Sequence, residues 1–139
     1  CGVLFPQSIF NDEPEFEKHL TVGSVYDMLL RLSLKCRFIA LDKPTFKRRR
    51  HSGNLSEASP ENQIMLFEVL HRFYYEKGGE KVITEKLAKD VFSKKCYRVA
   101  KYAVKANDMK LAREYIGKSL RYRIRVKPLW LLVKSFIRR

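Results

Sequence analysis

Apolar residues recur every three or four positions over most of the chain, which is the spacing of an amphipathic helix. The first such helix is expected to follow Ser24, and its apolar positions are Leu29, Leu30, Leu32 and Leu34, around Arg31 and Lys35. Ser24 and Asp27, three residues apart, resemble the start of a capping box. Because one face of this helix is apolar, it must pack on another part of the fold.

After this helix the pattern becomes extended. Arg37–Leu41 is rich in residues that favour strands, and Asp42–Pro44 is typical of a turn, because proline fixes φ and disfavours helix before it. A second extended run ends in Arg48–His51, and Ser52–Asn54 then lets the backbone turn. The pattern predicts a short strand pair with a cationic cluster at its end.

The second half of the chain is expected to be helical. Ser59 before Pro60 is typical of a helix start, and Gly78-Gly79 is typical of its end. A further helix is expected over roughly Val82–Ser93. From Lys94 to Ser119 small residues recur where two helices would cross, with Asn107-Asp108 between them, as in one tetratricopeptide repeat. A single repeat cannot bury its own faces, so this hairpin must pack on neighbouring helices.

The last segment, Arg121–Arg139, mixes basic residues with Trp130 and several aliphatic side chains. Two interpretations stay open. In the first, a terminal helix covers the open edge of the repeat. In the second, a basic amphipathic helix lies on an anionic membrane face. No apolar run approaches the ~20 residues of a membrane-spanning helix.

Composition narrows the class of protein. The chain has 29 Lys and Arg against 15 Asp and Glu, a formal charge of +14, which favours partners that carry phosphates. A hydrophobic share of 45% argues against a disordered chain. Cys1, Cys36 and Cys96 are widely separated, so neither a disulfide framework nor a structural zinc site is expected, and a reducing cytoplasm fits best.

The order of motifs in the first half resembles family 2 glycosyltransferases. Gly2-Val3-Leu4-Phe5 precedes Tyr-Asp-x-x-Leu-Arg-Leu at Tyr26, then Arg-Phe-x-x-Leu-Asp-x-Pro at Arg37, then Arg-Arg-x-His-Ser-Gly-Asn-Leu-Ser at Arg48. This order, from Gly2 to Ser56, is similar to the C-terminal end of the catalytic domain in those enzymes. They have the GT-A fold and transfer a sugar from a nucleotide-sugar donor. A weaker similarity continues to the C-terminus, where similar enzymes also carry a helical tail.

The resemblance implies an α+β fold class that is mostly α. Residues 1–58 would be the C-terminal portion of a GT-A catalytic domain, with a helix and a short strand pair. Residues 59–139 would be an α-helical tail with one tetratricopeptide-like hairpin at about 93–126. We expect this chain to lack the donor-binding half and to be inactive alone, and we expect the acceptor to be a glycan or a lipid-linked molecule.

In the resembling enzymes an acidic pair before the Tyr-Asp helix supplies the catalytic base. Here Ser24 and Val25 stand at those positions, and neither can take a proton at neutral pH. Asp27 is the candidate substitute, although it could equally cap the helix. Further carboxylates precede it in the loop, at Asp12, Glu13, Glu15 and Glu17.

The donor side is expected at the basic loop. Arg48 and Arg50 alternate along an extended backbone, so both can reach one pyrophosphate, and a strand edge protected by charge is the alternative. The resemblance implies that His51 completes the coordination of Mg²⁺ or Mn²⁺ in the whole enzyme, the other ligands coming from an Asp-x-Asp motif that this sequence lacks. A solvated histidine is the alternative, and His19 and His71 are expected to be surface or helix-face residues.

Two other functions were weighed. A helical protein-interaction module of the tetratricopeptide type is the alternative to the transferase. Nucleic-acid binding is disfavoured, because no recognised motif is present and the basic residues are spread over several segments. A cytoplasmic protein is expected, with peripheral contact to the inner membrane face through Arg121–Arg139.

Overall fold

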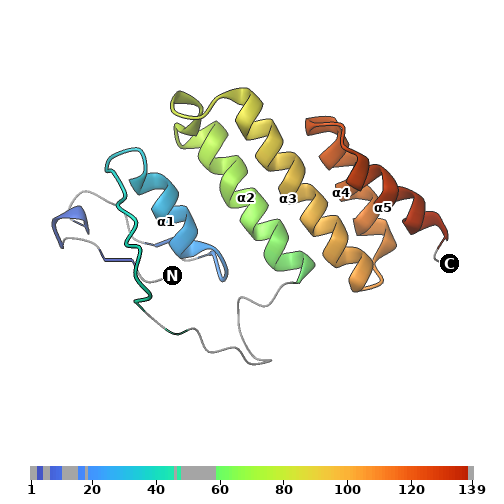
Figure 1. Ribbon diagram of the computed structural model, residues 1–139, viewed down its shortest axis with the longest axis horizontal. Helices are drawn as coiled ribbons and strands as arrows, with labels where there is room; N and C mark the ends of the chain where they lie inside the picture. The colour runs from blue at the N-terminus through green and yellow to red at the C-terminus, as the bar shows by residue number, and fades with distance from the viewer. Residues whose placement is uncertain are drawn as a thin grey trace.

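The computed structural model describes residues 3–4, 7–10, 16–17, 19–45, 47 and 59–137. Its helices within these residues are η1 (Gln7–Phe10), α1 (Ser24–Leu32), α2 (Pro60–Glu76), η2 (Gly79–Lys81), α3 (Glu85–Lys105), α4 (Met109–Tyr122) and α5 (Val126–Ile137). α1, α2, α3 and α4 lie side by side in chain order (Figure 1). The first half of the chain therefore joins the helical second half through α1.

The predicted α+β fold with a short strand pair is wrong, because the part of the chain that the structure describes is all helical and contains no strand. Arg37–Leu41 has no regular secondary structure, and no described backbone segment pairs with it. Ile39 is 88% exposed and Leu41 is 69% exposed. An extended segment becomes a strand only where a neighbouring backbone takes up its N–H and C=O groups. The second predicted strand runs into residues 46 and 48–50, outside the described range.

α1 does not begin with the capping box suggested by Ser24 and Asp27. Its N-cap is Gly23, whose φ of 95° is a left-handed conformation that glycine adopts at little cost, and no side chain caps the helix. The Gly23 carbonyl accepts the backbone N–H of Asp27 at 2.8 Å. A Cβ at position 23 would lie 3.3 Å from a methyl carbon of Leu66. The helix start is therefore set by close packing on α2.

The predicted ends of α2 are confirmed. The side chain of Ser59 accepts the backbone N–H of Asn62 at 3.2 Å, and Pro60 opens the helix. α2 ends at Glu76, shortly before Gly78, which has a φ of 86°. Both ends follow from local signals in the sequence.

α3 runs without a break, so the expected boundary near Ser93 and Lys94 is wrong. Ser93 and Ser119 are both fully buried, and the hydroxyl of Ser119 donates to the Ser93 carbonyl at 2.8 Å. Small residues let α3 and α4 approach closely there. The predicted turn is confirmed, because Asn107 has a φ of 62° and Asp108 accepts the backbone N–H of Leu111 at 2.9 Å.

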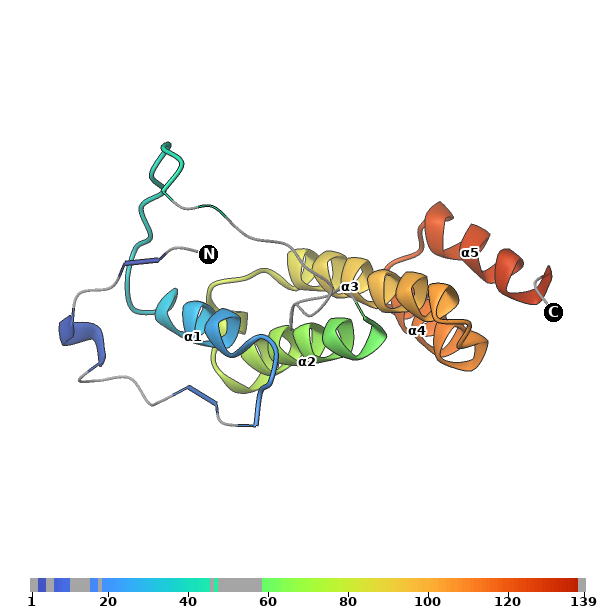
Figure 2. The same ribbon diagram turned by 90° about the horizontal axis from the view of Figure 1, so that it is seen from below.

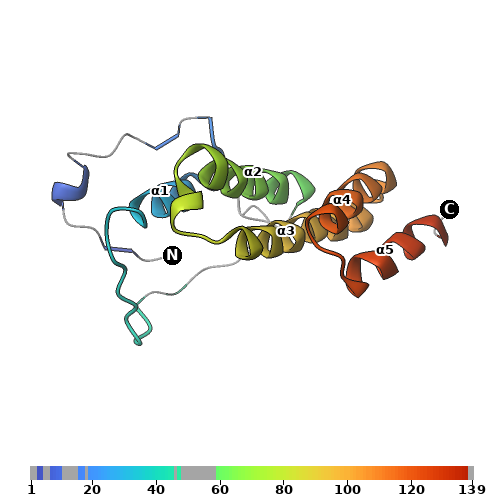
Figure 3. The same cartoon turned by 90° about the horizontal axis from the view of Figure 1, so that it is seen from above.

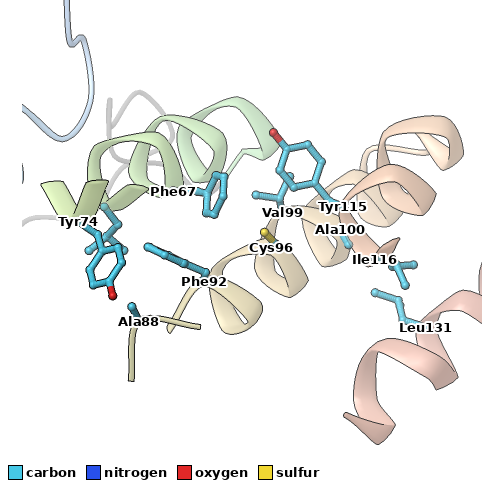
Figure 4. Packing of buried hydrophobic residues seen from close by; sticks show 11 residues of the cluster. Phe67, Tyr74, Ala88, Phe92, Cys96, Val99, Ala100, Tyr115, Ile116 and Leu131 are labelled. Carbon is cyan, nitrogen blue, oxygen red and sulfur yellow. The ribbon is translucent and has the colours of Figure 1, made fainter. Parts of the chain in front are cut away.

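The core is rich in aromatic side chains from α2, α3 and α4 (Figure 4). Phe92 is 2% exposed, and its ring centroid lies 6.0 Å from that of Phe67 and 5.8 Å from that of Tyr74, in edge contacts. Burying a side chain of this size stabilises the fold by about 2 kcal/mol. The sequence of α3 thus presents large residues toward α2 and small residues toward α4.

α5 packs along α4 and also contacts α3 (Figures 2 and 3). Its inner face consists of Pro128, Leu131 and Ser135, all buried, and Leu131 points toward Ile116 of α4 (Figure 4). This placement agrees with the first interpretation, a helix that covers the edge of the hairpin. Over the described residues, no helix combines the length and the apolar character needed to cross a bilayer.

Candidate functional site

The residues predicted to meet the donor lie outside the described part of the chain. Arg48, Arg50 and His51 all fall within residues 48–58. The segment that leads toward them, from Arg37 to Thr45, is exposed at every residue. Their role in pyrophosphate and metal binding stays a prediction.

Asp27 lies in a buried ion cluster between α1 and the end of α2. Its side chain is 1% exposed, Arg31 Nε donates to its Oδ2 at 2.9 Å, and Lys77 Nζ donates to its Oδ1 at 3.1 Å. Lys77 also donates to Glu17 Oε1 at 2.9 Å, and this hydrogen bond lowers the pKa of Glu17. Both oxygens of Asp27 are therefore occupied, and its contact with Lys77 holds α1 on the end of α2, which is the geometry of an anchor. A general base must instead reach the hydroxyl that it deprotonates.

This chain has no carboxylate at the position where the enzymes that it resembles carry an acidic pair. Ser24 is partly exposed at the helix start, and Val25 faces solvent. Of the loop carboxylates considered as substitutes, Glu17 belongs to the ion cluster, while Asp12, Glu13 and Glu15 lie outside the described residues.

A metal site is not found in the described part of the chain, where no group of three or more His, Cys, Asp and Glu side chains could hold an ion. His19 Nε2 lies 3.0 Å from Arg72 Nη1, on the surface. His71 packs its ring against Phe67 and Phe92, with centroid separations of 5.7 Å and 5.6 Å. These residues do not fit a magnesium or manganese site.

A basic groove of about 660 Å³ lies between α3 and the start of α5. This α3–α5 groove is lined by Val91, Lys94, Lys95, Tyr97, Arg98, Lys101, Arg125, Val126, Lys127 and Pro128. This groove was not predicted from the sequence, because its two walls are far apart along the chain. A signal was present, since neither Val91–Asn107 nor Tyr115–Arg139 contains an acidic residue.

One carboxylate, Asp90, pairs with two of the cations that line this groove, Lys94 and Arg125. Asp90 accepts from Lys94 Nζ at 2.7 Å and from both Arg123 and Arg125 in the segment between α4 and α5. The Lys94 hydrogen bond, with further bonds from the two arginines, lowers the pKa of Asp90 to about 2. Asp90 therefore fixes the α4–α5 connection on α3.

The remaining cations of the groove are less compensated. Among the described residues no carboxylate forms an ion pair with Lys95, Arg98, Lys101 or Lys127. Burial lowers the pKa of Lys95, and the charge of Arg98 adds to this effect. Crowded cations that lack counter-charges are suited to binding phosphate-like anions.

A second groove, also of about 660 Å³, lies between α2 and α4. This α2–α4 groove is lined by Phe67, Glu68, His71, Arg72, Lys89, Lys118, Arg121 and Tyr122. Aromatic rings and basic side chains thus meet in it, which suits a ligand with both apolar and acidic groups.

Comparison with protein-family models, with curated proteins and with solved structures finds no match for this chain.

Proposed function

We propose that this chain is the C-terminal part of an enzyme that resembles family 2 glycosyltransferases and transfers a sugar from a nucleotide-sugar donor to an acceptor hydroxyl. The observation that carries the proposal is the serial order of motifs from Gly2 to Ser56. The fold supports it in one respect. Asp27 and Arg31, the charged residues of the Tyr-Asp motif, pair at 2.9 Å within α1, and Asp27 joins that helix to Lys77 at the end of α2.

In the proposed reaction the acceptor oxygen attacks the anomeric carbon of the donor sugar. The bond from that carbon to the diphosphate oxygen breaks, the hydroxyl proton passes to a base, and the nucleoside diphosphate leaves. Arg48 and Arg50 neutralise the charge that develops on the leaving diphosphate. Asp27 is occupied by Arg31 and Lys77, so the base is supplied from elsewhere in the enzyme.

The test is calorimetric titration of the full chain with uridine diphosphate and guanosine diphosphate. Because this chain supplies the predicted diphosphate contacts but not the rest of the donor site, we expect weak binding of one of them through its diphosphate. The double variant Arg48→Gln/Arg50→Gln should weaken that binding at least about tenfold, because two charge-assisted contacts are lost. The control Lys43→Gln/Lys47→Gln removes the same charge from nearby positions and should change affinity less than about twofold. Absence of binding, or equal weakening by both pairs, would overturn the proposal.

A protein-interaction module of the tetratricopeptide type is the second candidate function. The α2–α4 groove favours it, because aromatic and basic side chains converge there around a volume of about 660 Å³. A peptide rich in Asp and Glu with one aromatic residue is the probe, measured by fluorescence polarisation. Binding should be lost in Lys118→Gln/Arg121→Gln and kept in Lys86→Gln/Lys110→Gln. No binding would remove this candidate.

A further inference from the structure

The outer face of α5 is apolar although it faces solvent. Val126, Trp130 and Val133 are 80%, 59% and 58% exposed, and Leu129 and Phe136 are also exposed. Spaced three or four residues apart, they form one stripe along the helix, opposite the buried Pro128, Leu131 and Ser135. We call these five exposed residues the outer stripe. A helix that is apolar on both faces has a second surface to cover.

The outer stripe meets the α3–α5 groove at Val126, which belongs to both. Beside it lie Lys127 of α5 and, across the groove, Arg98 and Lys101 of α3. At the other end of the stripe, the guanidinium carbon of Arg113 lies 4.5 Å from the centroid of the Phe136 ring. An apolar stripe therefore runs between basic side chains contributed by three helices.

From this arrangement we propose that the outer stripe and the α3–α5 groove together dock on the surface of an anionic phospholipid bilayer. The stripe enters the boundary between headgroups and acyl chains, while the groove binds lipid phosphates. The outer stripe and the α3–α5 groove both suit an anionic membrane surface. Burial of apolar side chains and attraction of Lys and Arg to acidic lipids add to each other in the free energy of binding. This inference goes beyond the proposed function and does not depend on it.

Charge favours a membrane over a second copy of this chain. The chain carries a formal charge of +14, and the stripe is flanked by Lys127 and Arg113, so two copies facing each other would bring like charges together. Burial, and secondarily the charge of Arg98, lowers the pKa of Lys95, and both residues line the α3–α5 groove, so a bound anion would offset their mutual repulsion.

Trp130 is the only tryptophan in the sequence, so its fluorescence reports directly on the outer stripe. The experiment mixes the full chain with vesicles of phosphatidylcholine alone or of phosphatidylcholine with 30% phosphatidylserine, a composition chosen as roughly that of an acidic membrane face. We expect sedimentation with the acidic vesicles only, a shift of Trp130 emission to shorter wavelength, and quenching by lipids brominated near the headgroup. Raising the salt concentration should weaken binding.

Two pairs of variants separate the parts of the surface. Trp130→Ser/Val133→Ser removes apolar area at exposed positions and should weaken partitioning at least about tenfold. Val25→Ser/Val82→Ser makes the same kind of change at exposed sites outside α5 and should have little effect. Arg98→Gln/Lys101→Gln/Lys127→Gln should weaken partitioning on the order of 100-fold. Lys43→Gln/Lys86→Gln/Lys110→Gln removes equal charge elsewhere and should act much less.

Several outcomes would overturn the inference. One is equal binding to both kinds of vesicle. Another is that the triple variant of the groove and its triple control elsewhere on the surface weaken vesicle binding equally. A Trp130 shift produced by inorganic phosphate without lipid would indicate a site for a free anion. A dimer by sedimentation velocity whose formation is lost in Trp130→Ser/Val133→Ser would show that the outer stripe binds a second copy instead.

Discussion

At the scale of single residues, buried charges decide how parts of this chain are held together. Asp27 joins α1 to the end of α2, and Asp90 joins α3 to the segment before α5. The sequence drew attention to Asp27 but could not assign its role, because its partner Lys77 lies fifty residues away. A candidate base and a structural anchor look alike until the tertiary neighbours are placed.

Replacing Asp27 by alanine should lower the free energy of unfolding by about 2–4 kcal/mol, because Lys77 and Arg31 then lose a buried partner. Chemical denaturation measures this. Asp42→Ala removes an exposed carboxylate and should cost less than about 0.5 kcal/mol. Equal effects of the two changes would show that the ion cluster does not anchor α1.

Asp90 should make stability depend on pH in the acid range. Its pKa in the folded state is about 2, below the ordinary value of 3.8, so its ion pairs stabilise the fold above pH 3.8 and are lost as pH falls toward 2. Asp90→Asn should therefore have a lower Tm than the unchanged chain at pH 7. The difference should narrow between pH 4 and pH 2, and a constant difference would contradict this.

The cysteines should differ in reactivity. Cys96 is fully buried, and burial raises the pKa of its thiol to about 12, whereas Cys36 is partly exposed near the end of α1. Since the thiolate is the reactive form, Cys36 should be alkylated at least about 100-fold faster than Cys96 at pH 8. Peptide mass spectrometry after timed alkylation measures both rates on the unchanged chain. In denaturant the two rates should become similar.

At the scale of elements, the sequence predicted the helix starts and turns that are determined by neighbouring residues. The start of α2 and the turn between α3 and α4 follow from Ser59, Pro60, Asn107 and Asp108, each of which acts on its nearest neighbours. The strand pair was predicted wrongly because local propensity alone cannot supply a partner strand, and Arg37–Leu41 has none among the described segments. The continuity of α3 was missed because Ser93 finds its hydrogen bonds on α4.

Removing the N-cap of α4 tests whether the start of this helix depends on the side chain of Asp108. Asp108→Ala deletes the side chain that accepts the Leu111 N–H, and it should lower the free energy of unfolding by about 1 kcal/mol. Lys110→Ala changes an exposed residue of the same helix and should be nearly neutral. Thermal denaturation monitored by circular dichroism compares the two, and similar losses would argue against a capping role.

At the scale of the whole molecule, charge and exposed apolar area are distributed unevenly. The core was predictable in outline from helical spacing, but the α3–α5 groove was not, because it forms only when the fold brings the start of α5 near α3. The described bundle carries a crowded basic region, the α3–α5 groove, and the sequence adds a second cationic stretch at residues 48–51, which lies outside the described residues. Binding of a nucleotide at a donor site must therefore be distinguished from non-specific binding of its phosphates to basic side chains.

Mapping a nucleoside diphosphate by NMR distinguishes them most directly. Uridine diphosphate or guanosine diphosphate, whichever binds by calorimetry, is titrated into ¹⁵N-labelled full chain, with inorganic phosphate as the reference titration. The proposed transferase function predicts that the nucleotide shifts amide signals of residues 47–56 and α1 beyond any change caused by phosphate. Shifts confined to Lys94–Lys101 and Arg125–Lys127, and reproduced by phosphate, would contradict a donor site in this chain.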